Sequence, residues 1–201
     1  MYLAMVGVEH LSINDPQELD NLNRFPMGTI HDLGMTKTLI LKRFMRNRPH
    51  LQFKAIKEPA ESPALRPFFR TADCILCCSN TISSRRACVN GAVQYRKLLV
   101  DVSVRDGRLG LGGCVRLYRP DSRLPGACPM CFLGSTASVV RGEGLLATAV
   151  CVTAALAAHI ITLEILGMNM HEQNGIEIDL WQPRIEALFV RRKTGCRCCS
   201  A

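Results

Sequence analysis

The spacing of apolar residues divides the first half of the chain into alternating strands and helices. Alternating positions or continuous apolar runs predict four strands, at residues 6–13, 51–56, 73–78 and 98–104. Helical spacing between them predicts three helices, at residues 35–45, 63–70 and 81–95, the last with Asn80 or Thr81 as its N-cap. Strands that alternate with helices predict an α/β domain with a mainly parallel sheet.

The pattern changes after residue 104. Residues 108–118 form a predicted antiparallel strand that is entered through glycines, and residues 145–166 form a long apolar helix. Two final strands, at residues 176–181 and 185–191, are spaced to pair as a hairpin about Gln182-Pro183. The chain contains no internal repeat, and we expect a single domain over residues 1–201.

The long apolar stretch at residues 145–166 has about the length that spans a bilayer. It contains His159 and Glu164 in its second half, and a charge facing lipid is costly. No second stretch of this kind is present in the sequence. We therefore interpret it as a fully buried core helix and predict no membrane association.

Composition adds a basic balance to this picture. Lys and Arg number 25 against 17 Asp and Glu, which gives a net charge of +8 and favours an acidic partner. A nucleic-acid partner is not indicated, because only 5% of the residues are aromatic and no groove-reading motif is found. Hydrophobic residues make up 48% of the chain, which excludes a mainly disordered protein.

Eleven cysteines are many for a chain of 201 residues. The opening sequence MYLAMVGVEH does not have the apolar run of a signal peptide, so we expect a reduced, cytoplasmic setting. There, clustered cysteines indicate metal binding or catalysis. Cys128-Pro-Met-Cys131 and Cys196-Arg-Cys-Cys199 are two pairs with the spacing that lets both thiolates reach one ion. Two such pairs predict a closed, structural Zn²⁺ site.

Two alternatives stay open for these cysteines. A redox CxxC is one, although such a pair normally stands alone at the start of a helix. Cys198 is also an alternative ligand to Cys196 or Cys199. The other six cysteines lie in apolar segments and are interpreted as buried small hydrophobic residues: Cys74, Cys77, Cys78, Cys88, Cys114 and Cys151.

With both cysteine pairs in place, other segments fall into a known order. The stretch from Asn14 to NLNR at residues 21–24 resembles an acid followed by S-N-L-N-R, and DLGMTK at residues 32–37 resembles D-x-G-x-x-K. ADCILCCSNTISSRR at residues 72–86 resembles A-D-x-V-x-D-x-x-D-N-x-x-x-R. This ordered set, with two halves of a zinc clasp, resembles the ThiF/MoeB/HesA family of ubiquitin-activating-enzyme-like adenylyltransferases.

The resemblance implies a Rossmann-like fold and a function. Family members use ATP and Mg²⁺ to adenylate the C-terminal glycine of a ubiquitin-like or sulfur-carrier protein, and they form homo- or heterodimers. By the match, Arg24 and Lys37 contact the phosphates and carry the catalysis. Six residues are implied to bind the nucleotide: Asn14, Asp15, Asn21, Arg24, Lys37 and Asn80. The single domain then divides into a partial nucleotide-binding part, 1–104, and a zinc-clasped part, 105–201.

The sequence also departs from the family pattern. It shows no glycine-rich phosphate loop, so we expect a Rossmann-like sheet that lacks its first βα unit. Asn80 occupies the position of the Mg²⁺-site aspartate, and Val140 lies near the position of the family's loop cysteine. Two interpretations follow: a divergent or N-terminally truncated adenylating enzyme, or a catalytically inactive member that serves as a zinc-stabilised binding or scaffold subunit.

Overall fold

The computed structural model of the chain describes residues 1–20, 22–23, 25–105, 111–121, 127–133, 147–168 and 173–199. These residues form two compact units, which are described separately: an N-terminal unit, Met1–Leu65, and a C-terminal unit, Arg66–Ala201. The parallel strands accordingly fall into two sheets, one in each unit. Whether residues 1–201 act as one domain, with a division at residue 104, stays a prediction.

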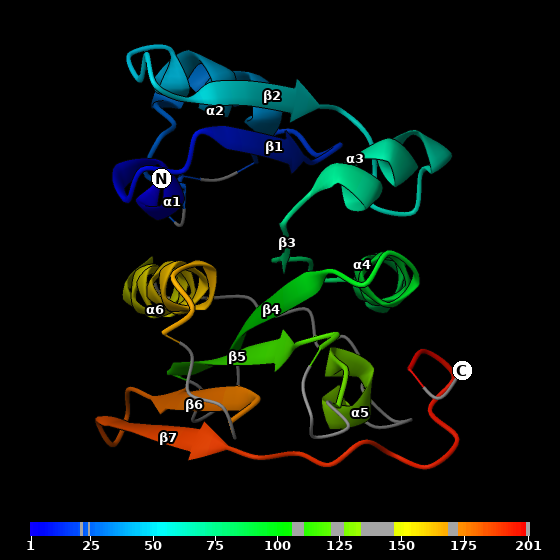
Figure 1. The fold of residues 1–201 in the computed structure, drawn as a ribbon. Helices are drawn as coiled ribbons and strands as arrows, with labels where there is room; N and C mark the ends of the chain where they lie inside the picture. The colour runs from blue at the N-terminus through cyan, green and yellow to red at the C-terminus, as the bar shows by residue number, and fades with distance from the viewer. Residues whose placement is uncertain are drawn as a thin grey trace. The chain divides into compact units, whose positions relative to one another are not determined.

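The N-terminal unit is built on a two-stranded parallel sheet (Figure 1). Its elements are α1 (Tyr2–Met5), β1 (His10–Asn14), η1 (Ile30–Asp32), α2 (Lys37–Met45), β2 (Gln52–Ile56) and η2 (Pro63–Leu65). Helix α2 packs on β2, and the buried Ala4, Met45 and Leu51 form a small core with Leu11 and Phe53. The strand predicted at residues 6–13 begins only at residue 10, because residues 6 and 7 turn at the end of α1.

The C-terminal unit contains a five-stranded sheet in the order β3-β4-β5-β6-β7. Its elements are α3 (Arg66–Thr71), β3 (Cys74–Cys77), α4 (Ile82–Gln94), β4 (Leu98–Arg105), β5 (Gly112–Tyr118), α5 (Pro129–Leu133), α6 (Ala147–Ile165), β6 (Gly175–Asp179) and β7 (Arg184–Leu188). Strands β3 and β4 are parallel, and the remaining neighbours are antiparallel. The predicted α/β fold with a C-terminal antiparallel extension is therefore confirmed.

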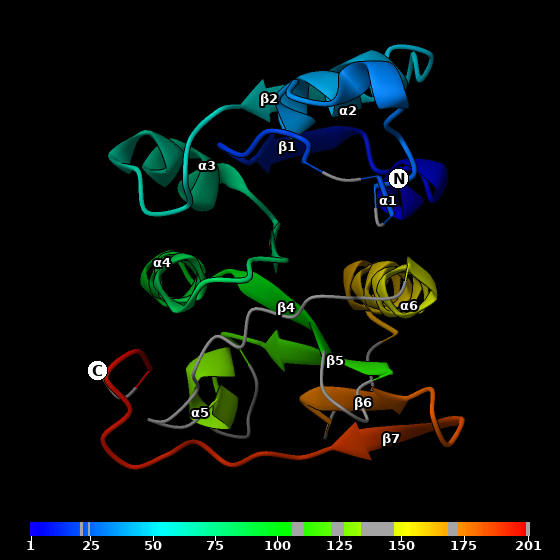
Figure 2. The same cartoon turned by 180° about the vertical axis from the view of Figure 1, so that it is seen from behind.

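Helices cover both faces of this sheet. Helix α6 packs on β4 and β5 from one side, whereas α4 and α5 lie on the other (Figures 1 and 2). Gly113 in β5 permits the approach of α6, because a Cβ atom there would lie 2.1 Å from the Thr153 hydroxyl. The start of α4 is capped by Thr81, whose hydroxyl accepts a hydrogen bond from the Ser84 N–H at 3.3 Å.

Helix α6 is the one described helix that is long and apolar enough to cross a membrane. Core helices of soluble proteins pass the same test of length and composition, so this finding alone is weak evidence. The prediction of a fully buried helix was wrong: Val152 and His159 are exposed. The reason is geometric, since a helix on one face of a sheet buries only the stripe that meets the strands.

The six cysteines outside the two pairs are not all buried, as was predicted. Cys77, Cys88 and Cys114 are buried, Cys74 and Cys151 are half-buried, and Cys78 is exposed. Cys78 follows the last residue of β3, where the chain leaves the sheet. Burial raises the pKa of the half-buried Cys74 thiol to about 12, so this group stays protonated at neutral pH.

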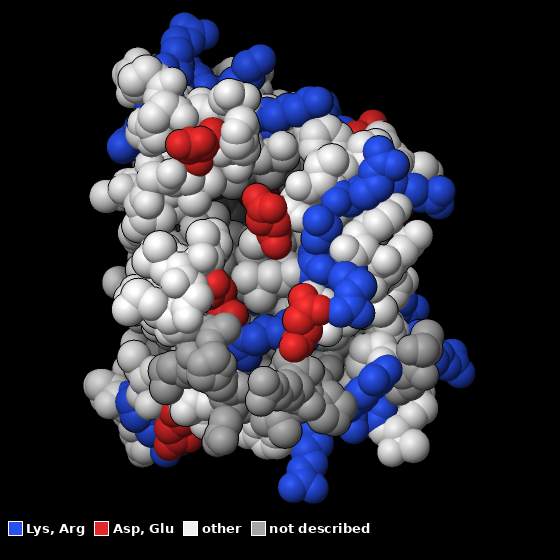
Figure 3. All heavy atoms as spheres, viewed as in Figure 1, with Lys and Arg blue, Asp and Glu red and all other residues white. Residues whose placement is uncertain are grey.

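Charged side chains are spread over the surface. On the face shown in Figure 3, Lys and Arg side chains extend from one end of the view to the other, with Asp and Glu side chains among them.

Candidate metal centre

The first pair of the candidate metal centre lies at the start of α5. Cys128 directly precedes the helix, Pro129 is its first residue, and the Cys131 N–H donates to the Cys128 carbonyl at 2.8 Å. Proline suits this position because its missing N–H has no partner in the first helical turn. The turn brings the two sulfur atoms to 3.9 Å from each other.

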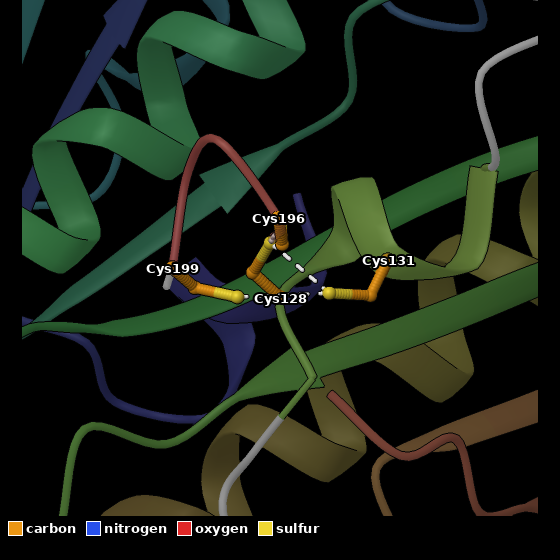
Figure 4. Close-up of side chains that lie close together, drawn as sticks. All are labelled: Cys128, Cys131, Cys196 and Cys199. Atoms are coloured by element: carbon orange, nitrogen blue, oxygen red, sulfur yellow. Dashed lines mark hydrogen bonds between the residues drawn. The ribbon is translucent and has the colours of Figure 1, made fainter. Parts of the chain in front are cut away.

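The second pair lies in the tight turns at residues 194–199. Gly195 has a φ of +73°, a conformation that favours glycine, and the Cys196 N–H donates to the Lys193 carbonyl at 3.1 Å. These turns direct Cys196 and Cys199 toward the first pair (Figure 4). Residues separated by about seventy positions are thereby joined at one point.

The four sulfur atoms have the spacing of a tetrahedral metal site. The Sγ atoms of Cys128 and Cys196 are 3.7 Å apart, those of Cys131 and Cys199 are 3.6 Å apart, and all four lie within 4.8 Å of one another. Four sulfurs about 2.3 Å from a central zinc ion are separated by about 3.8 Å. The distances therefore fit a metal ion and are far longer than a disulfide bond. Cys198 is not part of this group.

The burial of these thiols bears on their protonation. Cys128, Cys131 and Cys199 are buried, and Cys196 is half-buried. Burial, with the neighbouring sulfurs, raises the pKa of the Cys128 and Cys131 thiols. At Cys196 burial acts in the same direction, but the N–H groups of Cys198 and Cys199 outweigh it and lower the pKa to about 7. A bound cation would stabilise all four thiolates together.

Sulfur atoms occupy all four corners of the tetrahedron. A metal ion held by such a set would have no open position for water or a substrate, which is the arrangement of structural and not of catalytic sites. A four-cysteine cluster of this geometry could hold a metal ion that ties the end of the chain to α5.

Phe132, next to Cys131, anchors α5 on the sheet. Its ring lies against Gly175 in β6, where an added Cβ atom would come within 2.9 Å of the ring. On β5, the Arg116 guanidinium lies over the same ring, 5.9 Å from its centroid. These contacts pack α5, which carries Cys131, against β5 and β6.

Arg116 is also part of a buried ion triad that sequence reasoning missed. Asp101 in β4 receives Arg85 from α4 on one carboxylate oxygen and Arg116 on the other, the latter at 2.8 Å. Arg85 further donates to the Val102 carbonyl at 3.1 Å. Charges are seldom buried without a partner, so an aspartate in the mainly apolar strand β4 implies one. The sequence gives no signal for which arginines contact Asp101.

The predicted nucleotide residues of the N-terminal unit are partly brought together. Asp15 accepts the Gln17 N–H at 2.8 Å, and the Gln17 side chain accepts the Lys37 ammonium at 2.9 Å. Gln17 therefore contacts both residues, Asp15 through its backbone N–H and Lys37 through its side-chain amide. Asn14 instead donates to the Glu58 carbonyl at 3.2 Å, which ties the end of β1 to the loop after β2.

The remaining predicted nucleotide residues are placed differently. Asn80 is exposed in the C-terminal unit, just before the N-cap of α4. Asn21 and Arg24 lie outside the described residues, so their roles stay predictions. A hollow of about 400 Å³ in the N-terminal unit has Met27, Arg43, Phe44, Asn47 and Arg48 as its described lining residues, and Asn14, Asp15 and Lys37 are not among them.

Asp32 is the best-bound carboxylate of the N-terminal unit. One oxygen accepts the Thr29 N–H at 2.8 Å, the Thr29 hydroxyl at 2.9 Å and the Arg43 guanidinium at 2.7 Å. These bonds, that of Arg43 first, hold the pKa of this carboxyl well below its usual range. The spacing Thr29-x-x-Asp32 before a helical turn is the signal that could have identified it.

A Rossmann-like α/β fold with a four-cysteine clasp defines the class of protein. The ThiF family model matches residues 1–198, and the chain belongs to this family. The prediction from the ordered motifs is therefore confirmed.

Individual relatives are more distant. The chain is 28% identical over 151 residues to "Adenylyltransferase and sulfurtransferase MOCS3" of Drosophila persimilis, and 27% identical over 152 residues to the protein of that name from Drosophila virilis. Each match covers 70% of this chain, which spans about a third (34%) of the length of these relatives.

Solved structures show the same fold. Escherichia coli MccB, solved with ATP, superposes with a TM-score of 0.77 at 17% identity over 98% of this chain and 60% of its own. PaaA superposes with a TM-score of 0.71 at 16% identity over 92% of this chain and 66% of its own. At these identities the likeness concerns the fold alone.

Proposed function

We propose that this chain is an adenylating enzyme that uses ATP and Mg²⁺ to activate the C-terminal glycine of a ubiquitin-like or sulfur-carrier protein. The observation that carries the proposal is the family match over residues 1–198, together with the adenylyltransferase names of its relatives. In the proposed step a carboxylate oxygen of the carrier attacks the α-phosphorus of ATP. Pyrophosphate leaves with the electron pair of the broken P–O bond, and the carrier becomes an acyl adenylate.

The residues at the start of α2 fit this chemistry. The Lys37 ammonium is bonded to a neutral amide, Gln17, and no ion pair joins it to a carboxylate of the described residues, so its full charge can meet a phosphate. Asp15, on the same Gln17, would bind the nucleotide beside it. Arg24, with a planar guanidinium, would share the phosphates. Phosphoryl chemistry is promoted mainly by such positioned positive charge.

One observation favours a second candidate, an inactive scaffold subunit. Asn80 is an exposed amide where the family has a Mg²⁺-site aspartate, and an amide brings no negative charge to the metal. In this candidate the clasp and the fold serve only to bind a partner.

Pyrophosphate exchange separates the two candidates. Radiolabelled pyrophosphate should enter ATP when the chain is mixed with ATP, Mg²⁺ and a ubiquitin-like carrier that ends in glycine. We expect Lys37→Ala to lower the exchange about a hundredfold. Lys42→Ala, an exposed lysine on the same helix, is the matched control and should leave it unchanged.

The outcomes are distinct. No exchange with any of a panel of carriers and peptides would reject the enzyme and leave the scaffold. Exchange that is equally low in both lysine variants would reject the role of Lys37.

We further propose that the metal of the clasp is zinc. Zn²⁺ favours four thiolates in a tetrahedron, and its closed site would stabilise the fold without taking part in the reaction. The residues that would hold it are Cys128, Cys131, Cys196 and Cys199. A cytoplasmic location, where these thiols stay reduced, belongs to the same proposal.

A further inference from the structure

Gln17 joins the segment after β1 to the first residue of α2. Its backbone carbonyl accepts the Lys37 N–H at 3.1 Å, and its side-chain oxygen accepts the Lys37 ammonium at 2.9 Å. The first N–H groups of a helix have no partner within the helix, and Gln17 satisfies one of them. The same residue therefore holds Lys37 at its backbone and at the charged end of its side chain.

The backbone of Gln17 is itself fixed from the other side. Its N–H donates to the Asp15 carboxylate at 2.8 Å, which closes a turn over Pro16. The proline ring restricts the backbone between these two residues. Gln17 is thus bonded at both its N–H and its C=O, so its side chain starts from a well-defined position.

The chain around Gln17 runs antiparallel to the segment that enters α2. An isolated antiparallel bridge joins Glu18 to Thr36, so Gln17 lies directly opposite Lys37. Side chains that lie opposite each other in an antiparallel pair share a face. Leu19, two residues further on, is 2% exposed and anchors this segment in the N-terminal unit. The contact between the Gln17 and Lys37 side chains therefore follows from the backbone pairing.

The partner of the Lys37 ammonium is an uncharged amide. A carboxylate at residue 17 would form an ion pair with the ammonium and compete with a phosphate for it. The amide oxygen accepts one of the three ammonium hydrogens and adds no charge, so the positive charge stays available to a ligand. A lysine loses much rotamer freedom when it is fixed, and one that is already held loses less when a ligand binds.

We propose that Gln17 is a positioning residue of the nucleotide site, which holds the Lys37 ammonium in place for a phosphate group of ATP before the nucleotide binds. The motif order of the sequence assigns no role to Gln17. The inference rests on the proposed function, because it takes Lys37 as a phosphate contact. It does not require Gln17 to touch the nucleotide.

Two substitutions at residue 17 separate the role of the oxygen from that of the charge. Gln17→Met keeps the length of the side chain and removes the accepting oxygen, whereas Gln17→Glu keeps an oxygen and adds a negative charge. Titration calorimetry of the full chain with ATP and Mg²⁺ measures the affinity. We expect the dissociation constant to rise about fivefold in Gln17→Met. In Gln17→Glu it should rise about tenfold or more, because the carboxylate also repels the phosphates.

Gln52, an exposed glutamine in β2 of the same unit, provides the matched controls. Gln52→Met and Gln52→Glu should leave the ATP affinity unchanged. The melting temperature of each variant should equal that of the wild type, which separates a lost contact from a lost fold.

The mobility of the Lys37 side chain gives a readout that needs no activity. Carbon relaxation of the Lys37 ε-methylene group, recorded by NMR without nucleotide, should show a more mobile side chain in Gln17→Met than in the wild type. Equal mobility in the two proteins would overturn the positioning role.

A double-mutant cycle tests whether Gln17 acts through Lys37. Gln17→Met should cause no further loss of ATP affinity in the Lys37→Ala background. A further loss of the same size would mean that Gln17 contacts the nucleotide itself, and would overturn the positioning role. If Lys37→Ala binds ATP too weakly to measure, the NMR comparison decides.

Failure of this inference and failure of the proposed function give different results. A chain that binds ATP, weakens as expected in the Gln17 variants and shows no pyrophosphate exchange would reject the enzyme and keep the role of Gln17. A chain that exchanges pyrophosphate and binds ATP equally well in both Gln17 variants would keep the enzyme and reject the role of Gln17. A wild type that does not bind ATP would reject both.

Discussion

The two units differ in how their elements are held together. The N-terminal unit has a two-stranded sheet, a small apolar core and polar bonds close to solvent, such as the Gln17–Lys37 contact. The C-terminal unit has five strands, a buried ion triad and a four-cysteine cluster that joins distant parts of the chain. Two-stranded sheets are marginal alone, whereas covered sheets of five strands are stable. Most of the stability therefore belongs to the C-terminal unit.

This difference has a functional consequence. Of the predicted nucleotide residues, Asn14, Asp15 and Lys37 lie in the less strongly held unit, and only Asn80 lies in the other. Residues that bind and release ligands are commonly found in the less stable part of a fold. The clasp and the triad belong to the C-terminal unit alone, so substitutions in the two units should have separate consequences.

Removing the metal should have the largest effect. Cys128→Ser takes away one of four ligands, so zinc should fall from about one per chain to near zero. Structural zinc contributes folding free energy directly, and we expect the melting temperature to fall by about 10 °C or more. Elemental analysis by plasma mass spectrometry and thermal melting followed by circular dichroism are the measurements.

Cys198→Ser is the matched control, because Cys198 lies beside the cluster and is not part of it. It should keep the metal and the melting temperature. Loss of zinc in Cys198→Ser, or a metal-free wild type that is well folded, would contradict the assignment.

Breaking the ion triad should have the second-largest effect. Asp101→Asn leaves two arginines without their counter-ion, at a site where Asp101 is almost fully buried. We expect the free energy of unfolding to fall by about 3–5 kcal/mol. Urea denaturation measures it.

An exposed pair of the same chemistry provides the control. Asp121 pairs with Arg96 at the surface, where both side chains are more than two-thirds exposed. Asp121→Asn should cost less than about 1 kcal/mol. Equal losses of unfolding free energy in the two variants would mean that burial does not determine how much these ion pairs contribute to stability.

How far the sequence alone leads can be judged from such residues. The CxxC spacing is local and chemically specific, and the ordered motifs were enough to predict the ThiF family. Asp101 could not be assigned in the same way, because its partners come from α4 and β5 and meet only in the folded sheet. The apolar composition of residues 145–166 likewise predicted burial without indicating that one face of α6 stays open.

Strand and helix positions were predicted better than their ends. The strand predicted at residues 98–104 is β4, Leu98–Arg105, because apolar residues predominate in this segment. The strand predicted at residues 6–13 was placed too early, because residues 6 and 7 form a turn, with a φ of +89° at Gly7. Backbone conformation at single residues is decided by contacts that a periodicity does not contain.

A larger side chain at Gly113, where β5 meets α6, should have a smaller effect. In Gly113→Ala the new methyl group would clash with the Thr153 side chain, so α6 must shift from β5. We expect a loss of about 1–3 kcal/mol in the free energy of unfolding, measured by urea denaturation. The clash should be smaller in Gly113→Ala/Thr153→Ala, because the two closest Thr153 atoms are removed and only the Cβ remains, at 3.0 Å. Purely additive losses in a double-mutant cycle would show that the two residues do not conflict.

The smallest effect should come from acid, which acts on the N-terminal unit through Asp32. The pKa of this carboxyl is lowered by the hydrogen bonds from Arg43 and Thr29. A group with a lowered folded-state pKa contributes stability above its unfolded pKa, about 4, and loses it as the pH falls further. The protection of the amides around residues 29–35 against exchange, measured by NMR relative to the intrinsic exchange rate at each pH, should therefore fall below about pH 4.

Asp32→Asn tests this assignment, because it removes the titrating group together with its ion pair. Exchange around residues 29–35 should then be faster at neutral pH and change less with acid. Asp20→Asn, at an exposed aspartate of the same unit, should keep the wild-type pH dependence. An unchanged acid response in Asp32→Asn would assign the weakness of the N-terminal unit to its small core and not to this carboxylate.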